Sequence, residues 1–101
     1  MLIPEVKRKL RITYEDDEVD ERVKEIVAQG EADLRDLLAI GDEDFDFSEP
    51  GPEQALLLSW CFYEWNDALD DFQVNYAQRI AQLRDKWLAR SNAQEKAAEH
   101  V

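Results

Sequence analysis

Four carboxylates near the middle of the chain have the spacing of a calcium-binding loop. Positions 1, 3, 5 and 12 of a helix-loop-helix calcium site are matched by Asp42, Asp44, Asp46 and Glu53. Other positions do not fit, because Phe47 stands where the turn needs glycine, and Pro50 and Pro52 constrain the returning backbone. The sequence therefore favours a solvated acidic loop over a metal site.

The residue types that carry most catalysis and transition-metal binding are scarce. The one histidine, His100, is the penultimate residue, so we expect no Ser-His or Cys-His pair and no multi-histidine metal site. No Gly-rich phosphate loop is present. Cys61 stands among Leu, Trp and Phe, which indicates a core residue and a reducing compartment. We expect a binding or structural module without a cofactor, not an enzyme.

The net charge of −12 is unevenly distributed along the 101 residues. Residues 15–75 hold 20 of the 24 acidic residues and only three basic ones, whereas both ends carry a basic excess. Duplex phosphates require positive charge, so this pattern argues against a middle segment that grips nucleic acid. It permits charge-complementary stacking of subunits.

The densest acidic run, residues 15–21, has a structural and a functional interpretation. Acidic residues belong in the first turn of a helix, where they meet the positive end of the helix dipole. The functional interpretations are a surface that mimics DNA and a negative lining that repels DNA and lets it slide. The sequence leaves these alternatives open.

Two helices are predicted in the first 41 residues. Pro4 suits a first helical turn and predicts a short helix to about Leu10. Asp16 or Asp17 caps the next helix, whose apolar stripe runs from residue 19 to residue 38 with a 3.6-residue period. Gly30 on that face indicates a kink or a close helix crossing, and Gly41 fits a C-terminal cap.

Two further helices are predicted after an acidic loop, residues 42–51, whose Phe45 and Phe47 should pack against the helices. The third helix should run from about Pro52 to Leu69. Its segment 55–65 is apolar around nearly the whole circumference and must be covered on every side. The fourth should begin near residue 72 or 74 and pack a narrow stripe, residues 76, 80, 83 and 87, against the others.

The predicted fold class is all-α, a small bundle of about four helices. Residues 1–90 form a single domain, and residues 91–101 form a flexible C-terminal tail, because they lack an apolar stripe. No signal peptide is recognised, and no apolar run approaches the roughly 20 residues of a membrane span.

The order of several short motifs resembles the head-to-tail connector (portal adaptor) proteins of long-tailed phages and prophages, which are also called phage DNA-packaging proteins. The motifs are residues 10–17 (LRITYEDD) after a short helix, residues 63–65 (YEW) on the third helix, and residues 80–85 (IAQLRD) near the end. The resemblance covers about residues 1–88. The family tends to place Gly after Gln-Leu-Arg, where this chain has Asp85, and often has Arg in the Tyr-Glu-Asn-Arg-like stretch, where this chain has Trp65-Asn66-Asp67.

The resemblance implies a ring of about twelve copies beneath the portal protein, each joined to the next by two different faces. Such a ring joins the DNA-filled head to the tail or to a stopper or tail-completion protein, and DNA passes through it without specific binding. The implied location is the virion, with the host cytoplasm during assembly, and no membrane is involved. The tail after Arg90 would order on docking. The alternatives are an acidic DNA mimic and another helical protein-binding module.

The resemblance also implies two sets of site residues. The expected subunit or portal contacts are Trp60, Phe62, Trp65, Trp87, Arg79 and Arg84. A purely intramolecular core is the alternative for each aromatic residue of this set. The expected acidic lumen comprises Glu15, Asp16, Asp17, Glu18, Asp42, Glu43, Asp44 and Asp46.

Overall fold

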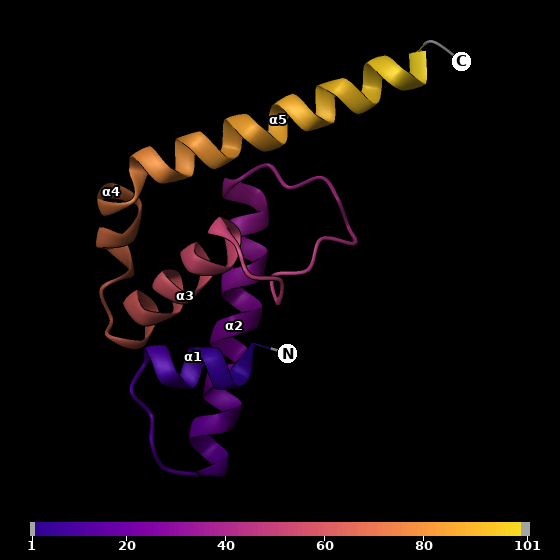
Figure 1. Cartoon of the computed structure of the whole chain (residues 1–101). Coiled ribbons are helices and arrows are strands. Elements are labelled where there is room, and N and C mark those ends of the chain that lie inside the picture. The colour runs from indigo at the N-terminus through magenta and orange to yellow at the C-terminus, as the bar shows by residue number, and fades with distance from the viewer. Residues whose placement is uncertain (1, 100–101) are drawn as a thin grey trace.

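The computed structural model describes residues 2–99, with side chains up to residue 93, and this part of the chain contains five α-helices and no strand. The helices are α1 (Ile3–Lys9), α2 (Asp17–Leu37), α3 (Pro52–Trp65), α4 (Phe72–Asn75) and α5 (Ala77–Glu99), with a short 3₁₀ turn, η1 (Leu69–Asp71), before α4. Figure 1 shows their arrangement. The all-α prediction is confirmed.

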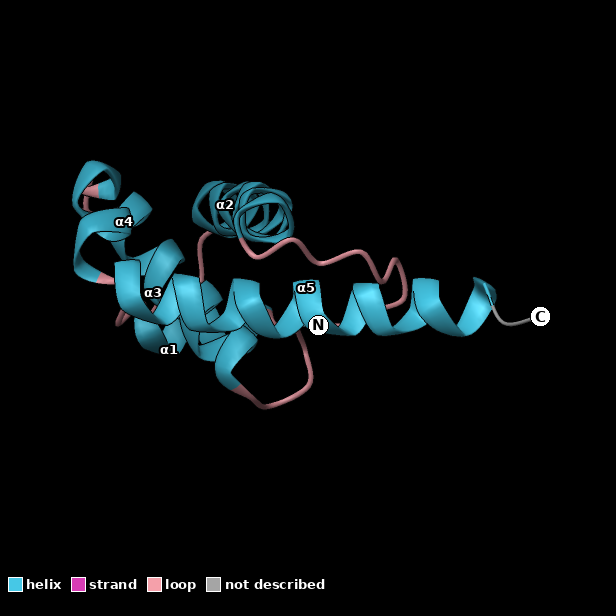
Figure 2. Cartoon of the chain, turned by 90° about the horizontal axis from the view of Figure 1, so that it is seen from above, coloured by secondary structure: helices cyan, strands magenta, loops and turns pink. Residues whose placement is uncertain are grey.

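The helices form a small body from which one end of α5 extends. α2 and α3 cross at the centre, α1 packs against both, and α5 lies over the C-terminal end of α2 (Figure 1). Seen from above, the last turns of α5 reach past the other helices (Figure 2). The chain therefore measures 54 × 27 × 18 Å. No helix within residues 2–99 combines the length and apolar character needed to cross a bilayer.

The crossing of α2 and α3 forms the centre of the core. α2 begins at the Asp16 cap and buries one stripe, as its period predicts. Where the helices cross, Gly30 leaves no room for a side chain, because an added Cβ would lie 2.8 Å from both Leu57 Cδ1 and Trp60 Cε3. Of the two alternatives predicted for Gly30, a kink or a close helix crossing, the structure shows the close crossing.

The apolar helix α3 is covered from several directions. α1 contributes the fully buried Val6, and the acidic loop contributes Phe47, which confirms that this loop packs inward. Cys61 of α3 has no exposed surface. Desolvation raises the pKa of its thiol to about 12, so the thiol stays protonated at neutral pH and fills space as a core residue.

Three of the helices end in the same backbone motif, although none of the ends contains glycine. A residue with positive φ follows the C-cap of α1, α2 and α3: Arg11, Ala39 and Asp67. At the end of α2, Ala39 N–H donates to Asp36 O at 3.2 Å and Ile40 N–H donates to Arg35 O at 2.9 Å. This pair of bonds defines a Schellman motif, and equivalent pairs close α1 and α3.

Two predicted helix boundaries are therefore wrong. Gly41 does not cap α2, because the helix ends at Leu37 and Ala39 takes the left-handed conformation. The third helix does not reach Leu69, because the left-handed Asp67 stops it after Trp65.

The C-terminal segment also differs from its prediction. The expected fourth helix is divided at Tyr76 into α4 and α5. The backbone has no boundary at residue 90, because α5 continues to Glu99. The flexibility of the tail, residues 91–101, stays a prediction, and His100 lies outside the described residues.

Replacing Ala39 by glycine should raise the free energy of unfolding by about 0.5–1 kcal/mol, because glycine adopts positive φ without the steric cost of a Cβ. Urea denaturation measures this change. The matched control is Ala28→Gly on the exposed side of α2, which should lower the free energy of unfolding by about 1 kcal/mol. Equal losses at both positions would contradict the assigned motif.

Replacing Gly30 by alanine should lower the free energy of unfolding by about 1–2 kcal/mol. The added methyl group forces Leu57 and the rigid Trp60 ring apart, and this overpacking exceeds the gain in helix propensity. Gly41→Ala is the control, because its Cβ meets nothing within 4 Å. Urea denaturation should show no loss for that variant, and an unchanged Gly30→Ala protein would disprove the tight crossing.

Candidate interaction surfaces

Two of the four aromatic residues expected at an interface lie in the core. Trp60 is 3% exposed, and its Nε1–H donates to Asp33 Oδ2 at 2.8 Å. Trp87 is 4% exposed and packs edge-on against Phe45, with ring centroids 5.0 Å apart. In this structure both indoles join helices or loops of one chain and have almost no surface left for a partner.

The other two aromatic residues reach the surface, and each lies beside a basic residue. Phe62 is 40% exposed, with Lys9 Nζ 5.9 Å from its ring centroid. Trp65 is half-buried, with Arg22 Cζ at 5.3 Å. Cation–π contacts at exposed sites stabilise by only about 0.5–1 kcal/mol, so a partner can displace these cations. Phe62 and Trp65 remain the aromatic candidates for an interface.

The two arginines predicted at the interface have different surroundings. Arg84 Nη1 donates to Asp36 O at 3.3 Å and to Leu37 O at 3.0 Å, at the C-terminal end of α2. Neither carbonyl has an i+4 helical partner, although Asp36 O also accepts Ala39 N–H, and both carry the negative end of the helix dipole, which a guanidinium satisfies. Arg79 is exposed and has no ion pair within the described residues.

Two further basic residues of α5 hold acidic residues in the body of the protein. Lys86 Nζ donates to both carboxylate oxygens of Glu53, at 3.0 and 3.1 Å, and Glu53 is only 7% exposed. Arg90 Nη2 lies 3.5 Å from Asp42 Oδ2. Together with Arg84, these contacts fix α5 against α3, the acidic loop and the end of α2.

These contacts engage two of the four carboxylates that have the spacing of a calcium-binding loop. Glu53, the twelfth position of that spacing, is directed to Lys86, and Asp42 is directed to Arg90. Asp46 Oδ1 accepts a hydrogen bond from Ser48 N–H at 2.8 Å, and the hydrogen bonds from Ser48 lower the pKa of Asp46. No group of three or more His, Cys, Asp or Glu side chains suited to a metal occurs in the part of the chain that the structure describes. The acidic side chains of the loop therefore stabilise its turns or form ion pairs with α5.

The eight acidic residues predicted to line a lumen form two groups at opposite ends of α2. The first group, residues 15–18, stands at the start of the helix, and the second, residues 42–46, follows its end. Since α2 has 21 residues, about 30 Å of helix separates the groups. Within one chain they do not form one continuous acidic surface.

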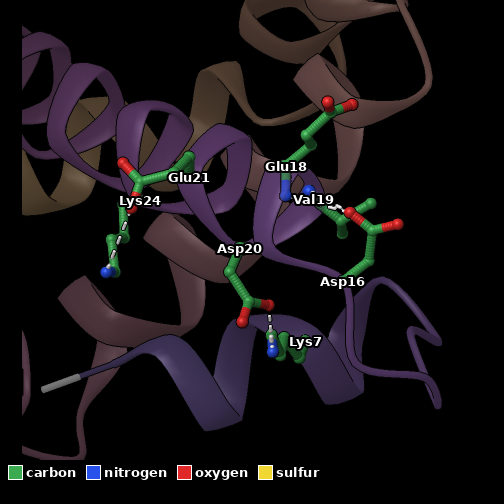
Figure 3. A network of polar contacts seen from close by, with 7 residues as sticks. All are labelled: Lys7, Asp16, Glu18, Val19, Asp20, Glu21 and Lys24. Carbon is green, nitrogen blue, oxygen red and sulfur yellow. Dashed lines mark hydrogen bonds and ion pairs between the residues drawn. The ribbon is translucent and has the colours of Figure 1, made fainter.

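Part of the first acidic group has a structural role, shown in Figure 3. Asp16 Oδ1 accepts hydrogen bonds from the backbone N–H groups of Glu18 and Val19, at 2.9 and 3.2 Å, and so caps α2. One turn on, Asp20 forms an ion pair with Lys7 of α1. The acidic run therefore starts α2 and joins it to α1, while the side chains of residues 15–18 stay exposed.

A groove that sequence reasoning missed lies where α2, α3, η1 and α4 meet. Its volume is about 660 Å³. It combines apolar and acidic side chains: Trp60, Leu69, Phe72, Val74, Asp33, Glu64 and Asp70, with Gln29 and Gln73. Its residues come from four segments, so the sequence shows only local pairs one helical turn apart, Gln29 with Asp33 on α2 and Trp60 with Glu64 on α3. We call it the acidic groove.

Replacing Arg84 by glutamine should lower the free energy of unfolding by about 1 kcal/mol, because the last carbonyls of α2 lose a charged donor. Arg79→Gln removes the same charge without a hydrogen bond and should change the free energy of unfolding by less than about 0.5 kcal/mol. Urea denaturation of both variants separates the two arginines. Equal effects would contradict the structural role of Arg84.

Comparison of the chain with protein-family models, with curated proteins and with solved structures finds no match.

Proposed function

We propose that this protein is a head-to-tail connector of a phage or prophage. The proposal is carried by the order of the three motifs across residues 1–88. In the fold, these motifs occupy junctions between helices: residues 10–17 join α1 to α2, residues 63–65 form the last turn of α3, and residues 80–85 lie on α5 over the end of α2. They therefore lie where the relative positions of the helices are set.

In the proposed role the protein forms a ring that seats on the portal and receives a stopper or tail-completion protein. Its part is structural and not catalytic. Each copy must present two different faces to its neighbours, because a closed ring of identical subunits requires a heterologous contact. Phe62 and Trp65 supply exposed aromatic surface for such contacts or for the portal.

The acidic residues act on DNA by repulsion in this proposal. Carboxylates that face the channel disfavour adhesion of phosphates, so the genome passes without binding. The groups at residues 15–18 and 42–46 lie at opposite ends of α2. Both can face the channel when α2 runs along the ring axis. The protein acts in the virion, after assembly in the host cytoplasm.

The proposal predicts that the protein adds ring-shaped density to the portal encoded in the same genome. The two proteins are produced together, and the portal complexes are viewed by negative-stain electron microscopy. Phe62→Asp should abolish the added density, because a carboxylate replaces the exposed aromatic contact. Leu88→Asp is the matched control, because Leu88 is also 40% exposed and lies outside the three motifs, and it should leave the ring unchanged.

Unchanged portal images with the unaltered protein would overturn the proposal. Binding to a purified DNA-binding protein in competition with DNA would instead favour the acidic DNA mimic.

A further inference from the structure

The acidic groove has the composition of a binding site for a guanidinium group. Its apolar part includes the buried Trp60 and Phe72, and Val74, 77% exposed, stands at its edge. The carboxylates of Glu64 and Asp70 have no ion pair within the described residues. Arginine pairs with carboxylates through its guanidinium and packs its methylene stem on apolar surface such as Leu69 and Val74, so both parts of the groove suit it.

None of the described side chains that line the groove is basic, so this part of the chain leaves the charge of the groove uncompensated. Asp33 holds Trp60 Nε1–H with Oδ2, which keeps the indole and this carboxylate in fixed positions. The partner that this surface lacks is therefore a positive side chain from another molecule.

The chain carries a matching feature on a different face. Arg79 is exposed at the start of α5, in a shallow hollow of about 90 Å³ beside Tyr76, Ala55 and Ser59. Ala55 and Ser59 lie about 140° around α3 from Trp60 and Glu64, at 3.6 residues per turn. The acidic groove and Arg79 are thus placed for two different neighbours.

We propose that Arg79 of one copy enters the acidic groove of the next, between Glu64 and Asp70. This contact specifies how neighbouring subunits of the proposed ring meet, so its biological role rests on the proposed function. The contact itself needs no portal. Because it joins two different faces, it propagates head to tail and closes into a ring when the rotation permits.

The charge distribution favours a second copy as the occupant. Copies with a net charge of −12 repel one another, so assembly requires a basic patch that meets an acidic one. Among the described basic residues of α5, Arg84, Lys86 and Arg90 are engaged within the chain, which leaves Arg79. A basic segment of another protein is the alternative that the test must separate.

The test is a dilution series of ¹H–¹⁵N NMR spectra at low salt, from about 0.05 to 1 mM protein, a range that detects even weak contacts. Resonances of the groove, including the Trp60 indole N–H, and resonances around Arg79 should shift together with concentration. Arg79→Glu and Glu64→Lys should each abolish these shifts, because each variant opposes like charges across the contact.

Complementation makes the test specific to this pair. The double variant with Arg79→Glu and Glu64→Lys should recover the concentration-dependent shifts, and so should an equimolar mixture of the two single variants. In the double variant, and between the two different variants of the mixture, residue 79 again meets an opposite charge at residue 64. Arg11→Glu and Glu43→Lys make the same charge changes at exposed positions outside both surfaces and should keep the wild-type shifts.

Three results would overturn the contact: constant spectra for the wild-type protein up to about 1 mM, shifts confined to other surfaces, or shifts that survive both charge reversals. Loss of the shifts in Glu64→Lys but not in Arg79→Glu would assign the groove to another basic segment and overturn the role of Arg79. Portal binding without groove shifts would overturn this contact alone. Groove shifts without portal binding would overturn the connector role alone.

Discussion

The need to cover α3 on nearly every side governs the fold. A helix with Leu, Trp, Cys and Phe around most of its circumference cannot leave one face to water, as an amphipathic helix does. α2 covers one side at the Gly30 crossing, α1 covers another, and the loop before α3 turns Phe47 inward. With α3 covered on these sides, most large apolar residues are used inside the chain, and Phe62 is the large apolar residue of α3 that reaches the surface.

The same constraint decides which tryptophans and arginines are used inside the chain and which remain at its surface. Trp60 and Trp87 serve the core because they occupy the inner faces of α3 and α5, whereas Trp65, at the last residue of α3, lies where cover ends. Arg84 serves the end of α2 because α5 crosses there, whereas Arg79, five residues earlier, points to no internal acceptor in the described structure. The position of a side chain in the fold, not its residue type, decides whether it remains for a partner.

Periodicity predicts the helices well but not where they stop. The stripe of α2 and the Asp16 cap are local features, so residues 16–38 of the sequence contain them. The helix ends depend on left-handed residues, and arginine, alanine and aspartate at residues 11, 39 and 67 carry no signal comparable to glycine. The acidic groove was missed for a different reason: it joins Asp33, Glu64 and Asp70 only after α2, α3 and η1 have packed. The sequence predicts each segment, but the site is a product of their arrangement.

Charged contacts contribute more to the packing of α5 on the other helices than to the packing of α2 on α3. In its described part only Leu83 and Trp87 are buried, while Arg84, Lys86 and Arg90 form charged contacts with other elements. Salt screens the attraction between exposed charges but does not weaken apolar burial. Added salt should therefore weaken the packing of α5 on the other helices more than the packing of α2 on α3. The ion pair between Lys86 and Glu53 resists this effect. Glu53 is only 7% exposed, so losing Lys86 would leave a buried carboxylate without a partner, which is costly. Arg79 lies on the same helix, so the pairing of Lys86 with Glu53 also fixes the direction in which Arg79 is presented.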